Sequence, residues 1–157
     1  MRALGEAGWS ESKPSEDDGL FHITADEWDA DAFLILLNIM HLRNRQIPRK
    51  LPLEMLAKIA VLVDYYECGE AVEMFTSLWI DHLKNVSALP LTYCRDLVLW
   101  IWVSWVFDIG DYFFLTTAAA IKEIDGTLRA LDLPIPSRVI GKSLVILLLL
   151  DELLSMK

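Results

Sequence analysis

The residues of this chain that could carry chemistry are three histidines, two cysteines and a pair of acids. None of His22, His41 and His82 belongs to a recognisable zinc-ligand spacing pattern. Asp108 and Asp111 lie on either side of a glycine, and we interpret them as the end of one helix and the N-cap of the next. The sequence has no GxSxG, GxxxxGK[ST], GxGxxG or HExxH motif. We therefore predict a protein that is not an enzyme and binds no metal or cofactor.

The two cysteines, Cys68 and Cys94, form neither a CxxC motif nor a disulfide framework. A nucleophilic thiol needs a neighbouring group that lowers its pKa, and the sequence places none beside either cysteine. We predict that both are buried core thiols of a reducing compartment, the cytoplasm or the nucleus. No secretory signal pattern opens the chain, which agrees with an intracellular location.

The net charge of the 157-residue chain is −9, which argues against nucleic-acid binding because a phosphate-binding face needs clustered Lys and Arg. The one basic cluster is Arg43, Arg45, Arg49 and Lys50, and we interpret it as a solvated connector between helices. Hydrophobic residues make up 54% of the chain and the mean hydropathy is +0.36, whereas roughly 45–50% apolar residues is usual. We therefore expect a partner or a second copy to cover part of the apolar surface.

Two apolar stretches, 97–107 and 144–150, are too short to cross a membrane, since a spanning helix needs about 20 apolar residues. Residues 1–19 are polar and rich in Gly and Ser, and we predict a disordered tail there. Residues 20–23 alternate weakly and predict at most one short strand. Hydrophobic periodicity then predicts helices at roughly 30–42, 53–67, 70–84, 91–107, 111–123 and 137–154.

Several local signals predict how these helices begin and end. Thr24-x-x-Glu27, Asp29 and Asp31 compete as N-caps of the first helix. Gly69 predicts a left-handed cap that ends the second helix, and Pro90 predicts the start of the fourth. Glu54 and Lys58 are spaced for an i,i+4 ion pair. In the fourth helix, Trp100, Trp102 and Trp105 must point in different directions, and we expect core positions for them.

Three segments together resemble BTB/POZ domain proteins of filamentous fungi. They are the phrase AFLILLNIMHLRNRQIPRKLPLEMLAKIAVLVDYYECGEAVEMFTSLWIDHLK at 32–84, RDLVLWIWVSWVF at 95–107 and LPIPSRVI at 133–140. The resemblance implies a mainly α fold in which a partial BTB/POZ-like helical core at 20–88 runs into a BACK-like helical extension at 89–157. It also implies that the first half of the domain, which supplies much of the family's homodimer surface, is missing.

The resemblance implies a non-catalytic protein–protein interaction module that docks through apolar helix faces onto a protein partner or a second copy. The expected partner-binding residues are Phe33, Leu36, Met40, Leu56, Ile59, Tyr66 and Trp79. Narrower alternatives are a substrate adaptor for a cullin-type ubiquitin ligase and an assembly module of a transcription regulator. A peripheral membrane protein and a truncated fragment without function are further alternatives. The sequence identifies neither the partner nor the oligomeric state.

Overall fold

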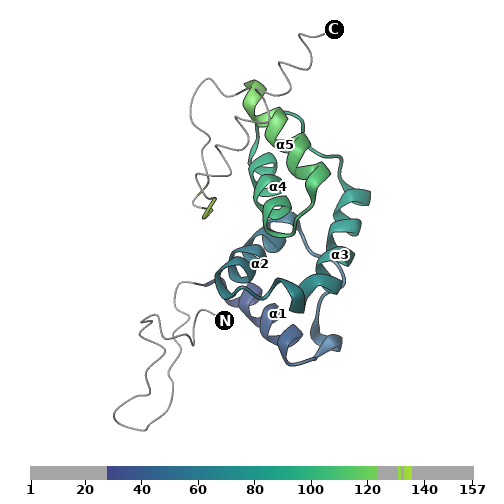
Figure 1. Ribbon diagram of the computed structural model, residues 1–157. Coiled ribbons are helices and arrows are strands. Elements are labelled where there is room, and N and C mark those ends of the chain that lie inside the picture. Colours follow the sequence, from purple (N-terminus) through teal and green to yellow (C-terminus); the bar gives the residue numbers. More distant parts are fainter. Residues whose placement is uncertain (1–27, 124–130, 132, 136–157) are drawn as a thin grey trace, which may run out of the picture.

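The computed structural model describes residues 28–123, 131 and 133–135, and Figure 1 shows that they form a bundle of helices. Five α-helices and one short 3₁₀-helix make up this part, which contains no β-strand. The predicted mainly α fold is thereby confirmed. The tail expected at 1–19, the strand expected at 20–23 and the helix expected at 137–154 lie outside the described residues.

The first helix, α1 (Ala30–Met40), begins at Asp29. The Asp29 carboxylate accepts a hydrogen bond of 3.0 Å from the backbone N–H of Ala32, which satisfies one of the donors that a helix start leaves free. Of the competing cap signals, Asp29 is therefore the residue that is used. The 3₁₀-helix η2 (Asn44–Gln46) follows in the connection to the next helix.

The second helix, α2 (Leu53–Tyr66), occupies the centre of the bundle. Helices α1, α3 and α4 all pack against it, so most of its apolar residues are buried. Two tryptophan side chains stabilise this packing by donating hydrogen bonds to backbone carbonyls. The indole N–H of Trp102 donates to the Ala57 carbonyl at 3.2 Å, and that of Trp79 donates to the Pro48 carbonyl at 2.8 Å. Both indoles are fully buried, where a donor without a partner would be costly.

The third helix, α3 (Gly69–Val86), leads through an exposed connection to α4 (Arg95–Val106). The predicted start of the fourth helix near Pro90 is wrong, because residues 91–94 are exposed and non-helical. A helical turn there would bury nothing, and short helices depend on packing for their stability. In α4, Trp102 faces α2, whereas the ring centroids of Trp100 and Trp105 lie 5.0 Å from that of Tyr112 and 5.8 Å from that of Phe113. Trp102 thus points away from the other two, and the predicted core position holds for Trp100 and Trp102, while Trp105 is half-buried.

The fifth helix, α5 (Gly110–Glu123), packs along α4 (Figure 1). Small residues allow this close approach: Ala119 and Ala120 are buried against Leu97 and Ile101. Buried hydroxyl groups on both helices donate to carbonyls within their own helix. Thr116 donates to the Tyr112 carbonyl at 2.6 Å, and further bonds of this kind come from Ser104 and Thr117.

Three helices end in the same way, with a non-glycine residue in the left-handed region. The residues are Leu42, Glu67 and Asp108, with φ values of 57°, 52° and 52°. In each case the backbone N–H of the following residue donates a hydrogen bond to the carbonyl five residues before it, as in a Schellman motif. These bonds are Arg43 to Asn38 (2.8 Å), Cys68 to Val63 (3.2 Å) and Ile109 to Ser104 (2.9 Å).

The prediction that Gly69 caps α2 is wrong. Glu67 takes the left-handed conformation, and Gly69 is already the first residue of α3. The reason is that the hydrogen bond from the Cys68 N–H to the Val63 carbonyl completes the end of α2 before the chain reaches Gly69.

Two ion pairs connect helices that are distant in the sequence. Lys58 binds the carboxylate of Asp29 at 2.7 Å, and Arg95 binds Glu54 through two guanidinium nitrogens, with a shortest distance of 2.6 Å. The predicted ion pair between Glu54 and Lys58 is therefore replaced by two longer-range pairs. Lys58 pairs with Asp29 at the start of α1, and Glu54 pairs with Arg95 at the start of α4.

Candidate protein-interaction surface

The outward side of α1 is apolar. Leu34 and Met40 are 54% and 44% exposed, and Leu37 between them is half-buried. We call these three residues the α1 outer face. The inward side of the same helix carries Ala32, Leu36 and Ile39, all buried in the core. Because α1 is apolar on both sides, α2 and α3 can cover only part of it.

The polar residues of α1 do not reduce the apolar character of this face. Asn38 lies in the interior with only 5% of its surface exposed. Asp31, in the first turn, is the only charged residue of the helix. A helix on the surface of a monomer normally shows the opposite arrangement, with polar side chains outward. The α1 outer face is therefore the strongest indication of an interaction site among the described residues.

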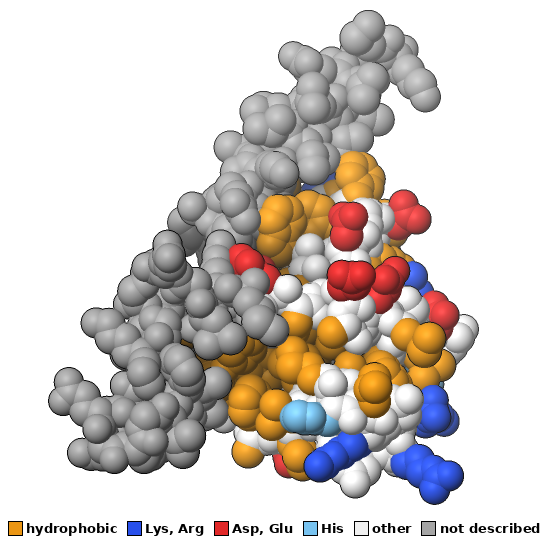
Figure 2. Space-filling model, turned by 60° about the horizontal axis from the view of Figure 1, so that its bottom comes forward, with side chains coloured by type: hydrophobic (Ala, Val, Ile, Leu, Met, Phe, Trp, Pro, Cys, Tyr) orange, Lys and Arg blue, Asp and Glu red, His pale blue; other side chains and the backbone are white. Residues whose placement is uncertain are grey.

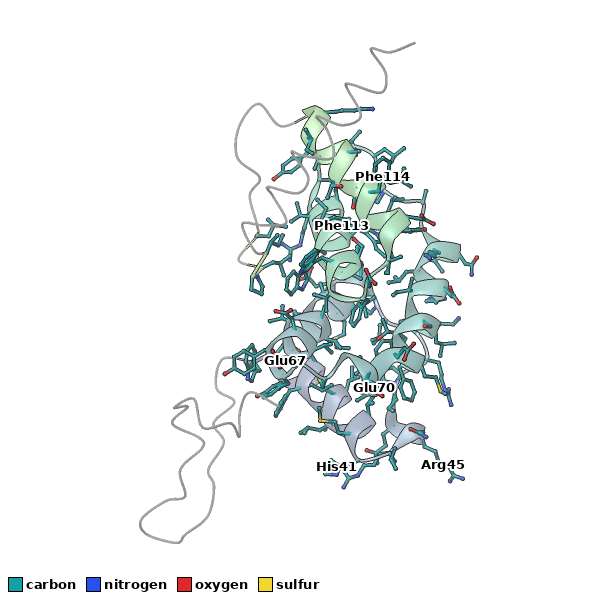
Figure 3. The ribbon with its side chains drawn as sticks, viewed as in Figure 1. His41, Arg45, Glu67, Glu70, Phe113 and Phe114 are labelled. Atoms are coloured by element: carbon teal, nitrogen blue, oxygen red, sulfur yellow. The ribbon has the colours of Figure 1, made fainter. Side chains whose placement is uncertain are left out.

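Figure 2 shows the end of the bundle to which α1 belongs, and hydrophobic side chains are spread over it. Figure 3 places His41 and Arg45 at this same end, pointing away from the bundle. The apolar surface thus has a polar and basic border. Interfaces between proteins commonly combine an apolar centre with a polar rim.

Aromatic side chains form a cluster beside the start of α1. The ring centroids of Trp28 and Tyr65 are 4.8 Å apart, those of Tyr65 and Tyr66 are 4.9 Å apart, and Phe33 lies 6.1 Å from Tyr66. All four residues are half-buried, so each ring keeps part of its surface available. Partly exposed Trp and Tyr side chains are frequent anchors at interfaces.

The expected partner-binding residues fall into two groups. Phe33, Tyr66 and Met40 retain exposed surface and lie on or beside the α1 outer face. The others are in the core, with relative exposures of at most 1%, and so cannot contact a partner in this conformation: Leu36, Leu56, Ile59 and Trp79.

The burial of Leu56 and Ile59 has a direct physical cause. Helix α2, which we expected to present an uncovered stripe, is enclosed by α1, α3 and α4. Trp79 is held inward by its hydrogen bond to Pro48. In this conformation the predicted residues Leu56, Ile59 and Trp79 therefore lie in the core, whereas Tyr66 at the end of α2 and the outer side of α1 keep exposed surface.

The sequence prediction missed Trp28 and Leu34. Trp28 directly precedes the N-cap residue Asp29, and an apolar residue at that position often packs against the first turns of its helix. That signal could have revealed the aromatic cluster. Leu34 has no equivalent signal, because its neighbours Leu36 and Leu37 are residues of the same type on the same helix.

The electrostatics near this surface come mainly from the pair of Asp29 and Lys58. The hydrogen bond from Lys58, together with that from the Ala32 N–H, lowers the pKa of Asp29 below its ordinary value of 3.8. The same contact with Asp29 raises the pKa of Lys58. Both groups therefore remain charged at neutral pH and hold the start of α1 on α2.

The cysteines differ from their prediction in part. Cys68 is half-buried, and desolvation raises the pKa of its thiol, so the thiolate is disfavoured at neutral pH. Cys94 is exposed at the N-cap of α4, and its predicted core position is wrong because the connection before α4 is uncovered. Within the described ranges, no three His, Cys, Asp or Glu side chains are placed to hold a metal ion.

No helix among the residues that the structure describes is long and apolar enough to cross a membrane. Comparisons with protein-family models, with curated proteins and with solved structures each found no match. The resemblance of residues 32–84 to BTB/POZ domains therefore stays a prediction from the sequence.

Proposed function

We propose that this protein is a non-catalytic protein–protein interaction module that binds a partner protein, or a second copy, through the α1 outer face. The single observation that carries the proposal is that α1 is apolar on both sides, with Leu34 and Met40 exposed while Asn38 is buried. Apolar surface of this kind gains about 25 cal/mol per Å² when it is removed from water. A partner that covers α1 would supply that stabilisation.

The proposed mode of binding is helix-face docking. Leu34, Leu37 and Met40 would form the centre of the contact, and the half-buried rings of Phe33 and Tyr66 would add anchors at its edge. A specific interface usually buries about 800 Å² on each partner, so the contact must extend beyond these side chains. The exposed ends of α1, including His41, are available for its polar rim.

The finer proposal is that the module is of the BTB/POZ type. Its support is the order and spacing of the three sequence segments at 32–84, 95–107 and 133–140. A substrate adaptor for a cullin-type ubiquitin ligase and an assembly module of a transcription regulator are the two narrower forms. They differ in the identity of the partner, a cullin in the first and a DNA-binding protein in the second.

The test compares tagged wild-type protein with a variant carrying Leu34→Glu and Met40→Lys. Both are purified from cells in parallel, and the proteins that co-purify with each are identified. Both positions are exposed, and Lys at position 40 suits the last turn of a helix, so we expect the fold to be preserved. We expect the variant to lose a partner that the wild type retains. Cooperative thermal unfolding with a similar midpoint would verify that the variant is folded.

The matched control is Val86→Lys. Val86 is 68% exposed at the last turn of α3, and Figure 1 shows α3 running away from α1. This variant should retain the partner at the wild-type level. Equal partner recovery by all three proteins would exclude the α1 outer face as the binding site.

A further inference from the structure

A groove lies between α3 and the turn that joins α4 to α5. It has a volume of about 460 Å³ and is lined by one side of α3 and by residues 106–109. Its floor contains the apolar side chains of Ile80, Val106, Phe107 and Ile109. The groove is thus a concave apolar surface, distinct from the α1 outer face.

Acidic side chains surround this floor. They are Glu70, Glu73, Asp81 and Asp108. Within the described part of the chain, none of them forms an ion pair, whereas Asp29 and Glu54 are both paired. Lys84 is the single cation among the described residues that line the groove, and it lies 4.6 Å from the centre of the Tyr112 ring. The groove therefore presents an excess of negative charge around an apolar floor.

The connection between α1 and α2 has the complementary composition. Leu42 at its start is 81% exposed, and four exposed cations follow without an acid between them: Arg43, Arg45, Arg49 and Lys50. These cations, too, form no ion pair with a described residue. We call residues 42–50 the basic loop.

The basic loop cannot reach the groove of its own molecule. The Trp79 indole binds the Pro48 carbonyl at 2.8 Å, which holds the loop against one side of α3. The groove is lined by Glu73, Ser77 and Ile80 on another side of the same helix. Figure 3 shows Arg45 at the lower end of the bundle and Glu70 higher up, at the start of α3. Figure 2 shows acidic and basic side chains gathered on different parts of one face.

We propose that the groove binds the basic loop of a second copy of this chain. Leu42 of one copy would contact the apolar floor, and Arg43 and Arg45 would approach the carboxylates of Glu73 and Asp81. Charge complementarity identifies this occupant: four exposed cations on one surface match four acids on the other, and none of the eight forms an ion pair with a described residue. Such complementarity sets orientation and the rate of encounter between proteins.

The contact is heterologous, because it joins two different surfaces. Each copy therefore keeps one free groove and one free basic loop, and further copies can add in a head-to-tail manner. The charged groups lie at the surface, so salt screens them over a Debye length of about 10 Å at 0.1 M. We expect association at low ionic strength that weakens as salt is added.

The conformation of Leu42 provides a variant that separates folding from association. Leu42 has a φ of 57°, a conformation that glycine adopts without steric cost. Leu42→Gly should therefore leave the midpoint of unfolding unchanged or raise it. The same change removes the apolar tip of the basic loop, and we expect at least a roughly tenfold weaker association.

The experiment is sedimentation velocity of the full chain over a range of concentrations, at low and at high salt. Wild type should associate at low salt, while Asp81→Lys and Arg45→Glu should each remain monomeric. A mixture of these two variants should associate, because the intact groove of Arg45→Glu can pair with the intact basic loop of Asp81→Lys. Asp64→Lys, an equal charge change at an exposed position on α2, should associate like the wild type.

Three results would overturn the proposal. The first is a wild type that is monomeric at every concentration, and the second is a mixture of Asp81→Lys and Arg45→Glu that stays monomeric. The third is association that Leu34→Glu abolishes and Asp81→Lys leaves intact, since the second copy would then bind the α1 outer face. Loss of self-association in Asp81→Lys with retention of a separate partner would support both surfaces independently.

Discussion

Replacing Leu36 and Leu34 by alanine, one at a time, tests the orientation of α1 with a matched pair of substitutions. The two leucines lie two residues apart on one helix, yet Leu36 is 1% exposed and Leu34 is 54% exposed. Leu36→Ala would leave a cavity between α1 and the rest of the core. Leu34→Ala would remove carbon atoms that already contact solvent.

The expected magnitudes follow from this difference in burial. Each Leu→Ala change removes three carbon atoms, which are worth about 0.8 kcal/mol each when they are buried. For Leu36 the cavity adds to this transfer term, giving a loss of about 3 to 5 kcal/mol in the free energy of unfolding. For Leu34 about half of the transfer term applies and no cavity forms, so the loss is about 1 kcal/mol. We therefore expect the two variants to differ by at least about 2 kcal/mol.

Urea denaturation followed by far-ultraviolet circular dichroism measures both values. The dependence on urea should stay the same in the two variants, because the surface exposed on unfolding hardly changes. Equal losses, or a larger loss for Leu34→Ala, would refute the assignment of the inner and outer sides of α1.

Three further changes test individual contacts. Asp29→Ala should lower the free energy of unfolding by about 1 kcal/mol, because the N-cap of α1 is lost. Asp29→Asn should lower it by less, because the amide oxygen of Asn can still accept the hydrogen bond from Ala32. Equal losses for the two variants would argue against that hydrogen bond. Because the pKa of Asp29 is lowered in the fold, its charge stabilises the protein above the unfolded pKa, and this contribution disappears as pH falls through the folded value. The difference in urea midpoint between wild type and Asp29→Asn should therefore be smaller at about pH 3 than at about pH 7, and an unchanged difference would contradict the ion pair with Lys58. Leu42→Gly should raise stability by about 0.5 to 1 kcal/mol by relieving a left-handed residue whose side chain is exposed, and a loss on thermal unfolding would count against that cap.

Sequence periodicity predicts where the helices lie, because it depends on local spacing. It locates α1, α2, α3 and α5 to within a few residues. Their ends depend on longer-range conditions. Helix α2 ends at Glu67 in the left-handed conformation that glycine usually adopts. Glu54 forms an ion pair with Arg95, 41 residues away, and not with the nearby Lys58.

The candidate interaction surface is harder to predict than the helices. Leu34, Leu36 and Leu37 are identical in type, so hydrophobicity alone could not show which one faces solvent. The packing of α1 on α2 and α3 determines which of the leucines is exposed. The exposed position of Asp31 and the burial of Asn38 follow from the same packing and carry no separate sequence signal.

The most direct test of the account is a photoreactive amino acid placed at position 34 of the full chain in living cells. We expect a crosslink from this position to another polypeptide, and no such crosslink from the same amino acid at position 86 on the last turn of α3. Absence of any crosslinked product at position 34 in folded protein would contradict the claim that the exposed side of α1 binds a protein.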